Sequence, residues 1–282
     1  MTVKNGQDPQ ILPMRYQSGA LAAPDLEMLT FAEVRAMRAG TESSPVIRAD
    51  FHVLASCTDG NGRLRVDFAA HPFGAGDLAW IRPGWTHRWD DIADVQGSLV
   101  LLRPEFVSTA IIGADPPGML VSPMSKTTPL ITTAIEHLHR EYAAVETDPI
   151  PDSTTILRNL LEVILLRTRA GQHYRTTGEV FDTFARAVEA HHRETRELSW
   201  YAAELGYSAR TLSRASHAAA GMSAKQFIDD RVILEAKRLL VHGNLTASEC
   251  ARRLGFDDPA NFAKFFRTRT ATSPGRFKAA AT

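Results

Sequence analysis

Between residues 25 and 104, short apolar runs of strand length alternate with turn sequences rich in glycine, asparagine and proline. The run from Arg63 to Ala69 alternates charged and apolar side chains, which is typical of a strand with one buried face. The tetrapeptide from Asp59 to Gly62 is one of several turn signals between the runs. This spacing predicts a sandwich or a small barrel. The predicted strands are Asp50–Ser56, Arg63–Ala69, Asp77–Arg82 and Ser98–Arg103.

Two amphipathic helices are predicted next, over residues 129–145 and 153–168. The second helix has two neighbouring apolar stripes, Ile156/Leu160/Val163 and Leu157/Leu161/Ile164. A face of that width has to be covered. A second copy of the chain would cover it in a two-fold dimer, and the alternative is the helix at 129–145 of the same chain.

The remaining residues, 179–282, have the apolar spacing of about seven short helices. Glycines mark four expected helix ends, where a left-handed residue is favoured. Two sequences are expected to cap helix starts: Thr246-Ala-Ser-Glu249 as a capping box, and Asp258 before Pro259. The four glycines are Gly206, Gly221, Gly243 and Gly255.

This helical part repeats itself at a spacing of 49 to 50 residues. Each copy predicts a short helix, a turn made of glycine and an aromatic residue, and a second helix, which is the layout of a helix-turn-helix. The first copy contains Ser199, Ala202, Leu205, Gly206, Tyr207, Leu212, Arg214, Ser223 and Phe227. The second contains Ser248, Ala251, Leu254, Gly255, Phe256, Phe262, Lys264, Ser273 and Phe277.

Helix periodicity places polar side chains of each second helix opposite the predicted core. Arginines at the start of a recognition helix can bind the O6 and N7 atoms of guanine in the major groove. The alternative is a solvated charged surface. The candidate DNA-binding residues are Arg210, Thr211, Ser213, Arg214 and His217 in the first copy, and Asn261, Lys264 and Arg267 in the second. The second copy has Pro259, Ala260 and Ala263 where polar base contacts would be expected, so we expect it mainly to bind phosphates.

Charge separates the two parts of the chain, although its formal net charge is zero. Acidic residues exceed basic ones by five over residues 1–174, and basic residues exceed acidic ones by five over residues 175–282. A basic C-terminal part is expected to bind a polyanion. With 44% hydrophobic and 23% charged residues, the composition excludes a disordered chain, a collagen and a coiled-coil rod.

The two cysteines, Cys57 and Cys250, cannot form a disulfide framework, which favours a cytoplasmic protein with reduced thiols. The N-terminus lacks the pattern of a signal peptide, and no apolar stretch is long enough to span a membrane. We expect a leader at 1–24, a first domain at 25–172 and a second at 173–282, with a linker from Gly171 to Gly178.

Residues 180–278 resemble the C-terminal DNA-binding domain of the AraC/XylS transcription regulators. The matching motifs are Ser208-x-x-x-Leu212-x-Arg214, Gly221-x-Ser223-x-x-x-Phe227-Ile228, Gly255-Phe256-x-Asp258 and Ser273-Pro274-x-x-Phe277. Two positions depart from the family pattern: Ala271 replaces its usual glycine, and Lys278 its usual arginine. The resemblance implies two helix-turn-helix units bridged by a long helix at 224–242.

The first domain resembles the cupin-like effector domain common in that family, through Gly76-Asp77-Leu78 and Pro83-Gly84-x-x-His87. The fold class is therefore expected to be α+β, with an N-terminal β-barrel, two interface helices and an all-α C-terminal domain. The resemblance also assigns the helices at 129–145 and 153–168 to a dimer interface.

Aromatic and polar side chains gather in the segment 80–89, where a small organic effector is expected to bind. The candidates are Trp80, Arg82, His87 and Trp89. The alternative is that Trp80 and Trp89 belong to the barrel core.

An enzyme of the cupin type is the main competing function, and the histidines disfavour it. Of the ligands that catalytic cupins use, His87 alone has a counterpart, whereas metal sites need three or more protein ligands. His137 and His139 stand two residues apart in a helix, so their side chains diverge. We therefore expect no catalytic residues, no cofactor and no metal.

These observations predict a transcription regulator that binds double-stranded promoter DNA under the control of a small organic effector. A homodimer through 153–168 is expected, RNA polymerase is a further candidate partner, and no membrane is involved. The alternatives are a cupin-type enzyme and a DNA-binding protein without an effector.

Overall fold

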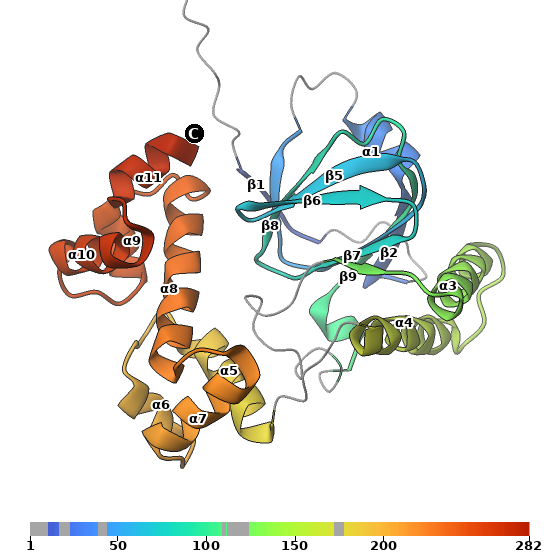
Figure 1. Cartoon of the computed structure of the whole chain (residues 1–282). Helices are drawn as coiled ribbons and strands as arrows, with labels where there is room; N and C mark the ends of the chain where they lie inside the picture. Colours follow the sequence, from blue (N-terminus) through green and yellow to red (C-terminus); the bar gives the residue numbers. More distant parts are fainter. Residues whose placement is uncertain are drawn as a thin grey trace, which may run out of the picture. The chain divides into compact units, whose positions relative to one another are not determined.

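The structure is a computed structural model that describes residues 11–16, 23–38, 44–108, 111, 124–171 and 178–281. These residues fall into two compact units, one ending at residue 171 and the other beginning at residue 178 (Figure 1). Residues 172–177 of the expected linker, and residues 1–10 and 17–22 of the expected leader, lie outside the described residues. No helix in the described ranges is both long and apolar enough to cross a membrane.

The N-terminal unit is built from two five-stranded sheets (Figure 1). One has the strand order β1-β3-β8-β5-β6 and the other β10-β7-β4-β9-β2. Their bounds are β1 Ile11–Met14, β2 Leu26–Thr30, β3 Val46–Ala49, β4 His52–Asp59, β5 Asn61–Val66, β6 Ala69–Gly74, β7 Asp77–Ile81, β8 Thr86–Asp90, β9 Gln96–Leu102 and β10 Met124–Lys126. Helix α1 covers Phe31–Met37, and a short 3-10 helix covers Pro104–Phe106.

The strands expected at 50–56, 63–69, 77–82 and 98–103 correspond to β4, β5, β7 and β9, with shifted ends. The strand expected to reach Ala69 ends at Val66, because Asp67 turns the chain with a φ of 50°. The remaining strands were not predicted. Four residues that we assigned to the leader form β1, which pairs in parallel with β3.

Helices α3 (Pro129–Thr147) and α4 (Ser153–Gly171) pack beside each other and bury an apolar cluster with side chains of β2, β4, β7 and β9 (Figure 1). The stripe of Leu157, Leu161 and Ile164 is fully buried in this cluster, so its expected place in a subunit interface is wrong. The other stripe of α4 remains partly exposed to solvent. Val163 is 43% exposed, and Leu166, three residues further along the helix, is 49% exposed.

Seven helices make up the described part of the C-terminal unit. They are α5 Glu179–His191, α6 Leu198–Glu204, α7 Ala209–Ala220, α8 Ala224–Val241, α9 Ala247–Arg253, α10 Pro259–Thr270 and α11 Pro274–Ala281. Helices α6 and α7 form the first helix-turn-helix, α9 and α10 the second, and α8 is the expected bridge (Figure 1). A single apolar cluster runs through both motifs and α8, so the unit has one continuous core.

The local helix signals in this unit explain several of the helix boundaries. The hydroxyl of Thr246 accepts a hydrogen bond from the Glu249 amide, and the Glu249 carboxylate accepts one from the Thr246 amide, which confirms the capping box. Asp258 caps α10 by accepting a bond from the Ala260 amide.

Three of the four predicted left-handed glycines are confirmed, at Gly206, Gly221 and Gly255. The prediction for Gly243 is wrong, because the left-handed residue there is Asn244, with a φ of 50°. Gly243 meets a different requirement. A Cβ at this position would lie 2.7 Å from the carbonyl oxygen of Leu239, closer than a side chain tolerates.

The two recognition helices end on different residues in the same left-handed conformation, Gly221 at a φ of 72° after α7 and Ala271 at a φ of 58° after α10. Nothing lies within 4 Å of a Cβ built on Gly221, so substitution there meets backbone strain alone. We expect Gly221→Ala to destabilise the unit and Ala271→Gly to stabilise it, each by roughly 0.5–1 kcal/mol, because strain of about 1–2 kcal/mol is partly offset by the entropy of glycine in the unfolded chain. Urea unfolding of both variants measures this, and shifts of the same sign would contradict it.

Candidate DNA interface and ligand cavity

The first helix-turn-helix presents the start of α7 to solvent. The Ser208 hydroxyl caps α7 by accepting a hydrogen bond of 3.0 Å from the Thr211 amide, and the two hydroxyls lie 2.8 Å apart. Leu212 is fully buried and fixes the inner face of the helix. The opposite face of α7 is therefore held in a defined orientation.

The five candidate residues of this motif lie on α7 around that open face. Arg210, Arg214 and His217 are exposed, and Thr211 and Ser213 are half-buried. The Thr211 hydroxyl takes part in the cap, so its first role is in the helix start. No ion pair within the described residues involves Arg210 or Arg214, which leaves two positive charges without an acidic partner there.

The second motif exposes a smaller set of polar side chains. Asn261, Lys264 and Arg267 are exposed on α10, and the buried Phe262 and Phe266 anchor its other face. The structure thus places the three candidates on one side of a helix that begins with Pro259.

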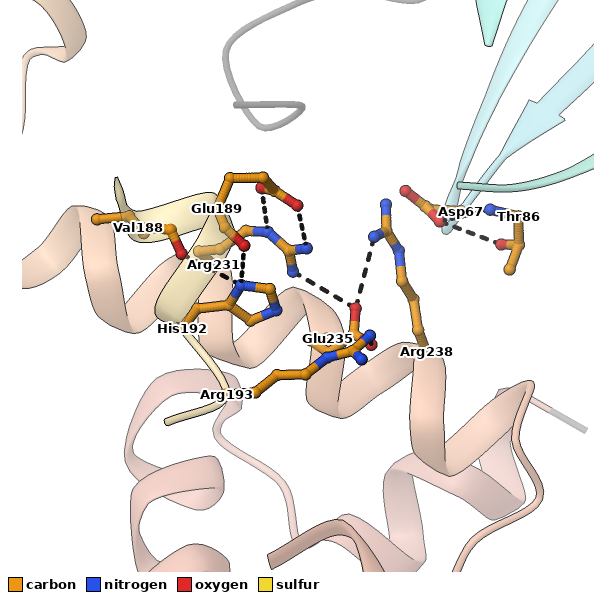
Figure 2. A network of polar contacts seen from close by, with 9 residues as sticks. All are labelled: Asp67, Thr86, Val188, Glu189, His192, Arg193, Arg231, Glu235 and Arg238. Atoms are coloured by element: carbon orange, nitrogen blue, oxygen red, sulfur yellow. Dashed lines mark hydrogen bonds and ion pairs between the residues drawn. The ribbon is translucent and has the colours of Figure 1, made fainter. Parts of the chain in front are cut away.

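A network of charged side chains joins α5 to α8, as Figure 2 shows, and its members on α8 are buried. The Arg231 guanidinium donates two hydrogen bonds to the carboxylate of Glu189, at 2.7 and 2.6 Å. Glu235 is fully buried and pairs with Arg193 at 2.5 Å, Arg231 at 3.5 Å and Arg238 at 3.6 Å. Sequence reasoning missed this network. Its signal was a row of charged residues in α8, the helix of the unit with the most buried side chains.

His192 lies beside this network with 4% of its surface exposed. Its Nδ1 atom lies 2.8 Å from the carbonyl oxygen of Glu189 (Figure 2), so a proton on Nδ1 can be donated to that oxygen. Burial, together with the positive charge of Arg231, lowers the pKa of His192 to about 4. The imidazole is therefore neutral at pH 7.

The N-terminal unit contains a cavity of about 320 Å³ with an almost entirely apolar wall. Side chains from β1, β2, α1, β3, β4, β8 and β9 line it. His87 and Trp89 of β8 face this cavity, so the structure brings these two candidates together. The contributions of β1 and α1 were missed, because no sequence pattern distinguished those segments.

Trp80 and Arg82 do not line the same cavity. Trp80 belongs to the apolar cluster between the sheet and helices α3 and α4, and its Nε1 atom donates a hydrogen bond to Nδ1 of His52 at 3.2 Å. The Arg82 guanidinium lies 4.1 Å from the centre of the Trp80 ring and 5.9 Å from that of Trp85. Trp80 and Ile81 are neighbours in the sequence, but their side chains face opposite sides of the sheet. Successive side chains of a strand point to opposite faces, so residues close in the sequence can lie in different clusters.

Polar groups are few in the cavity wall. His87 is buried, and its Nδ1 atom makes no hydrogen bond with the described residues. Burial lowers the pKa of His87 to about 4, although the nearby charge of Asp67 opposes the change. Arg38 and Ser44 also line the cavity, and each donates a hydrogen bond to the carbonyl oxygen of Trp89.

The histidines that the structure describes do not gather into a metal site. Among the described residues, no group of three or more His, Cys, Asp or Glu side chains could hold a metal ion. His137 pairs with Glu141 at 3.2 Å and His139 contacts the Ser98 hydroxyl at 2.8 Å, so these two helical histidines point to different partners.

Two family models match the chain. A model described as a helix-turn-helix domain matches residues 201–280, and one described as an AraC-like ligand binding domain matches residues 34–161. Among curated proteins, the virulence regulon transcriptional activator VirF of Yersinia enterocolitica is 25% identical over 172 residues, which is 58% of this chain and 60% of that protein. The transcriptional activator RhaS of Klebsiella pneumoniae is 22% identical over 237 residues, which is 80% of this chain and 84% of that protein.

Similar solved structures cover either the whole chain or its C-terminal part. A structure of ToxT from Vibrio cholerae with a bound unsaturated fatty acid is 11% identical, with a TM-score of 0.43, over 90% of this chain and 93% of that one. The DNA-binding domain of AdpA in complex with a target DNA is 30% identical, with a TM-score of 0.33, over 36% of this chain and 90% of that one.

The buried imidazole of His87 should make the N-terminal unit sensitive to acid. Its pKa is about 4 in the folded protein, against an ordinary value of 6.5 that the unfolded chain regains. Between pH 4 and pH 6.5 the imidazole is protonated in the unfolded chain but not in the folded protein. The contribution of the neutral imidazole to the free energy of unfolding is therefore complete above pH 6.5 and is lost as the pH falls toward 4. The loss is up to about 1.4 kcal/mol per pH unit.

We therefore expect His87→Leu to reduce the drop in unfolding free energy between pH 7 and pH 5 by roughly 2 kcal/mol. Urea unfolding followed by tryptophan fluorescence measures the drop. His137→Leu is the matched control, because the side chain of His137 is 51% exposed and should leave the drop unchanged. Equal drops in the wild type and His87→Leu would show that burial of this imidazole does not govern the acid response.

Proposed function

Because the chain belongs to the AraC family of transcription regulators, which are not enzymes, we propose that its C-terminal unit binds double-stranded promoter DNA through both helix-turn-helix motifs. The observation that carries this proposal is the exposed start of α7, where Arg210 and Arg214 have no acidic partner among the described residues. A family without enzymatic activity also removes the alternative of a cupin-type enzyme.

Helix α7 is the proposed source of base recognition. Arg210 and Arg214 are four residues apart and therefore lie on the same side of the helix. A guanidinium can donate two hydrogen bonds to O6 and N7 of one guanine, the commonest specific contact in the major groove. Ser213 and His217 lie close enough on the helix to contribute further contacts.

Helix α10 is the proposed anchor on the DNA backbone. Its exposed Lys264 and Arg267 suit phosphate oxygens, and Asn261 adds a hydrogen-bonding amide. Lysine is a compact charge without a planar donor fork, so it distinguishes bases less sharply than arginine. The helix also starts with Pro259 and Ala260, which have no polar side chain to offer a base.

We expect Arg214→Ala to weaken binding to the best site by about 1–3 kcal/mol and to relax the preference at one or two base pairs. Lys264→Ala should weaken binding more evenly across sequences, because a phosphate contact carries no base information. Selection from a random DNA pool, followed by titration of each variant, measures both effects. A larger change of the selected consensus in Lys264→Ala would reverse the assigned roles of α7 and α10.

The cavity of the N-terminal unit is the proposed effector site. Its wall is apolar on nearly all sides, so the effector needs an apolar body. The neutral imidazole of His87 lies in this wall and is the proposed partner for one polar group of that molecule, and Arg38 lies in the same wall. We therefore propose an apolar small molecule with a single hydroxyl or acid group. Trp80 and Arg82 are not part of this proposed site.

A thermal-shift experiment on the whole protein tests this class of effector. Decanol and decanoic acid at saturating concentration should raise the melting temperature by a few degrees, and glucose should not, because a sugar would leave its hydroxyls unpaired against an apolar wall. His87→Leu should reduce the shift caused by decanol. Stabilisation by glucose alone would contradict the proposal, and no shift with any of the three would favour the alternative of a DNA-binding protein without an effector.

We propose that the protein forms a homodimer through the apolar side chains of α4 that are exposed within one chain. Val163 and Leu166 are three residues apart on one side of α4 and are both exposed. A second copy of the same helix would bury them in a two-fold contact, the commonest symmetry among oligomers. The protein would act in the cytoplasm, where promoter DNA and RNA polymerase are present.

Sedimentation and circular dichroism of two aspartate variants test the dimer. We expect Leu166→Asp to be folded and monomeric, because its charge would enter the contact between two copies. Leu161→Asp is the control, and it should unfold the N-terminal unit because Leu161 is fully buried within one chain. A wild-type monomer, or a Leu166→Asp protein that remains dimeric, would refute this interface.

A further inference from the structure

The segment between α5 and α6 contacts the turn of the second helix-turn-helix, although it directly precedes the first motif in the chain. Arg196 in this segment donates one hydrogen bond of 2.8 Å to the carbonyl oxygen of Leu254 and another of 3.1 Å to that of Gly255. Its guanidinium also lies 3.6 Å from the centre of the Phe256 ring. One side chain thus holds the backbone and the aromatic residue of the second turn.

The backbones come close at the same place. A Cβ on Gly255 would lie 2.8 Å from the carbonyl oxygen of Arg193, so only glycine allows this approach. Gly255 also has a φ of 66°, which a larger residue adopts at a cost. The second turn is therefore fitted to the 193–196 segment as well as to its own helices.

A second chain of contacts reaches from Arg196 to α10. Lys225 of α8 donates a hydrogen bond to the Arg196 carbonyl oxygen at 3.1 Å and pairs with the carboxylate of Asp229 at 2.6 Å. Asp229 is almost fully buried and also pairs with Arg269 near the end of α10. These links tie the loop before the first motif, the bridging helix and the second recognition helix.

We propose that Arg196 sets the separation and rotation of the two recognition helices, so that the protein selects the spacing between the two DNA segments that it contacts. Arg196 is a positioning residue in this proposal, which rests on DNA binding by both motifs as proposed above. Each added base pair moves the second DNA segment along the axis and rotates it by about 34°. A rigid pair of helices can match one such position, whereas a loosely joined pair can follow several.

The two motifs share an apolar core, but that core alone does not define their relative rotation. Apolar contacts are not directional, whereas the two hydrogen bonds of Arg196 end on carbonyl oxygens that point in defined directions. Arg196 thereby links the orientation of the second turn to the first motif. The resulting preference for one spacing between the two DNA segments does not come from any base contact.

The test uses the whole protein and the duplex selected by the wild type from a random pool, with one or two base pairs inserted or removed between its two contacted segments. The wild type should lose about tenfold in affinity for each base pair of change, comparable to one mismatch in a site. Arg196→Ala should bind the best duplex more weakly and lose only about threefold or less per base pair of change. Arg196→Lys should behave similarly, because an ammonium lacks the guanidinium plane that lies over the Phe256 ring.

Arg214→Ala is the matched control, since it should alter base preference and keep the spacing profile of the wild type. Arg196→Ala should do the opposite, and its salt dependence should be unchanged, because a residue that binds no phosphate releases no counterion. If Arg196→Ala proves unfolded by circular dichroism, Arg196→Lys decides the question.

A wild-type spacing profile in the folded Arg196 variant, or a reduced salt dependence, would overturn the role of Arg196. A wild type that binds DNA but tolerates every spacing would overturn it as well, and would leave the proposed function standing. Failure of the wild type to bind any pool DNA would overturn both.

Discussion

The buried carboxylate of Glu235 is the constraint on which the C-terminal unit depends. A fully buried charge is tolerated only when opposite charges and hydrogen bonds surround it. Arg193, Arg231 and Arg238 provide them, and Arg231 is held in turn by Glu189 of α5. Removing one partner from such a network typically costs about 3–5 kcal/mol, because the remaining charge stays buried. The position of α5 on α8 is therefore fixed by electrostatics as well as by packing.

The exposed face of α7, which we propose to contact DNA, is positioned by that junction. Helices α6 and α7 lie between α5 and α8 along the chain, and their inner faces belong to the same apolar cluster. With the two outer helices fixed, the buried Leu212 sets the rotation of α7, and the arginines of its other face remain in solvent. The second motif is connected to this frame through α8 and through the contacts of Arg196 with residues 254–256.

In the N-terminal unit the corresponding constraint is the two-residue period of a strand. Side chains of β4, β7 and β9 that face inward join the core around the cavity, and their neighbours face α3 and α4. A polar group buried on either side needs a partner. Nδ1 of His52 obtains one from Trp80, and His52 lies outside the cavity wall, whereas His87 lies in that wall and its Nδ1 atom has no partner among the described residues. The place of His87 in the cavity wall makes it the candidate ligand contact.

The sequence by itself determined the features that depend on contacts within one or two helical turns. The capping box at Thr246, the left-handed ends at Gly206 and Gly221 and the exposed side of α7 follow from local hydrogen bonds and from the helical period. The repeat of 49 to 50 residues was sufficient to predict both helix-turn-helix motifs. Tertiary structure decided which stripe of α4 is covered, since this depends on where α3 and the sheet lie.

It also decided that Trp80 and His87 face different regions, that Asn244 rather than Gly243 takes the left-handed conformation, and that Arg196 reaches a turn 58 residues away. These outcomes depend on the relative placement of elements that are distant in the chain. Periodicity gives the face on which a residue lies, but it contains no information about which element will cover that face.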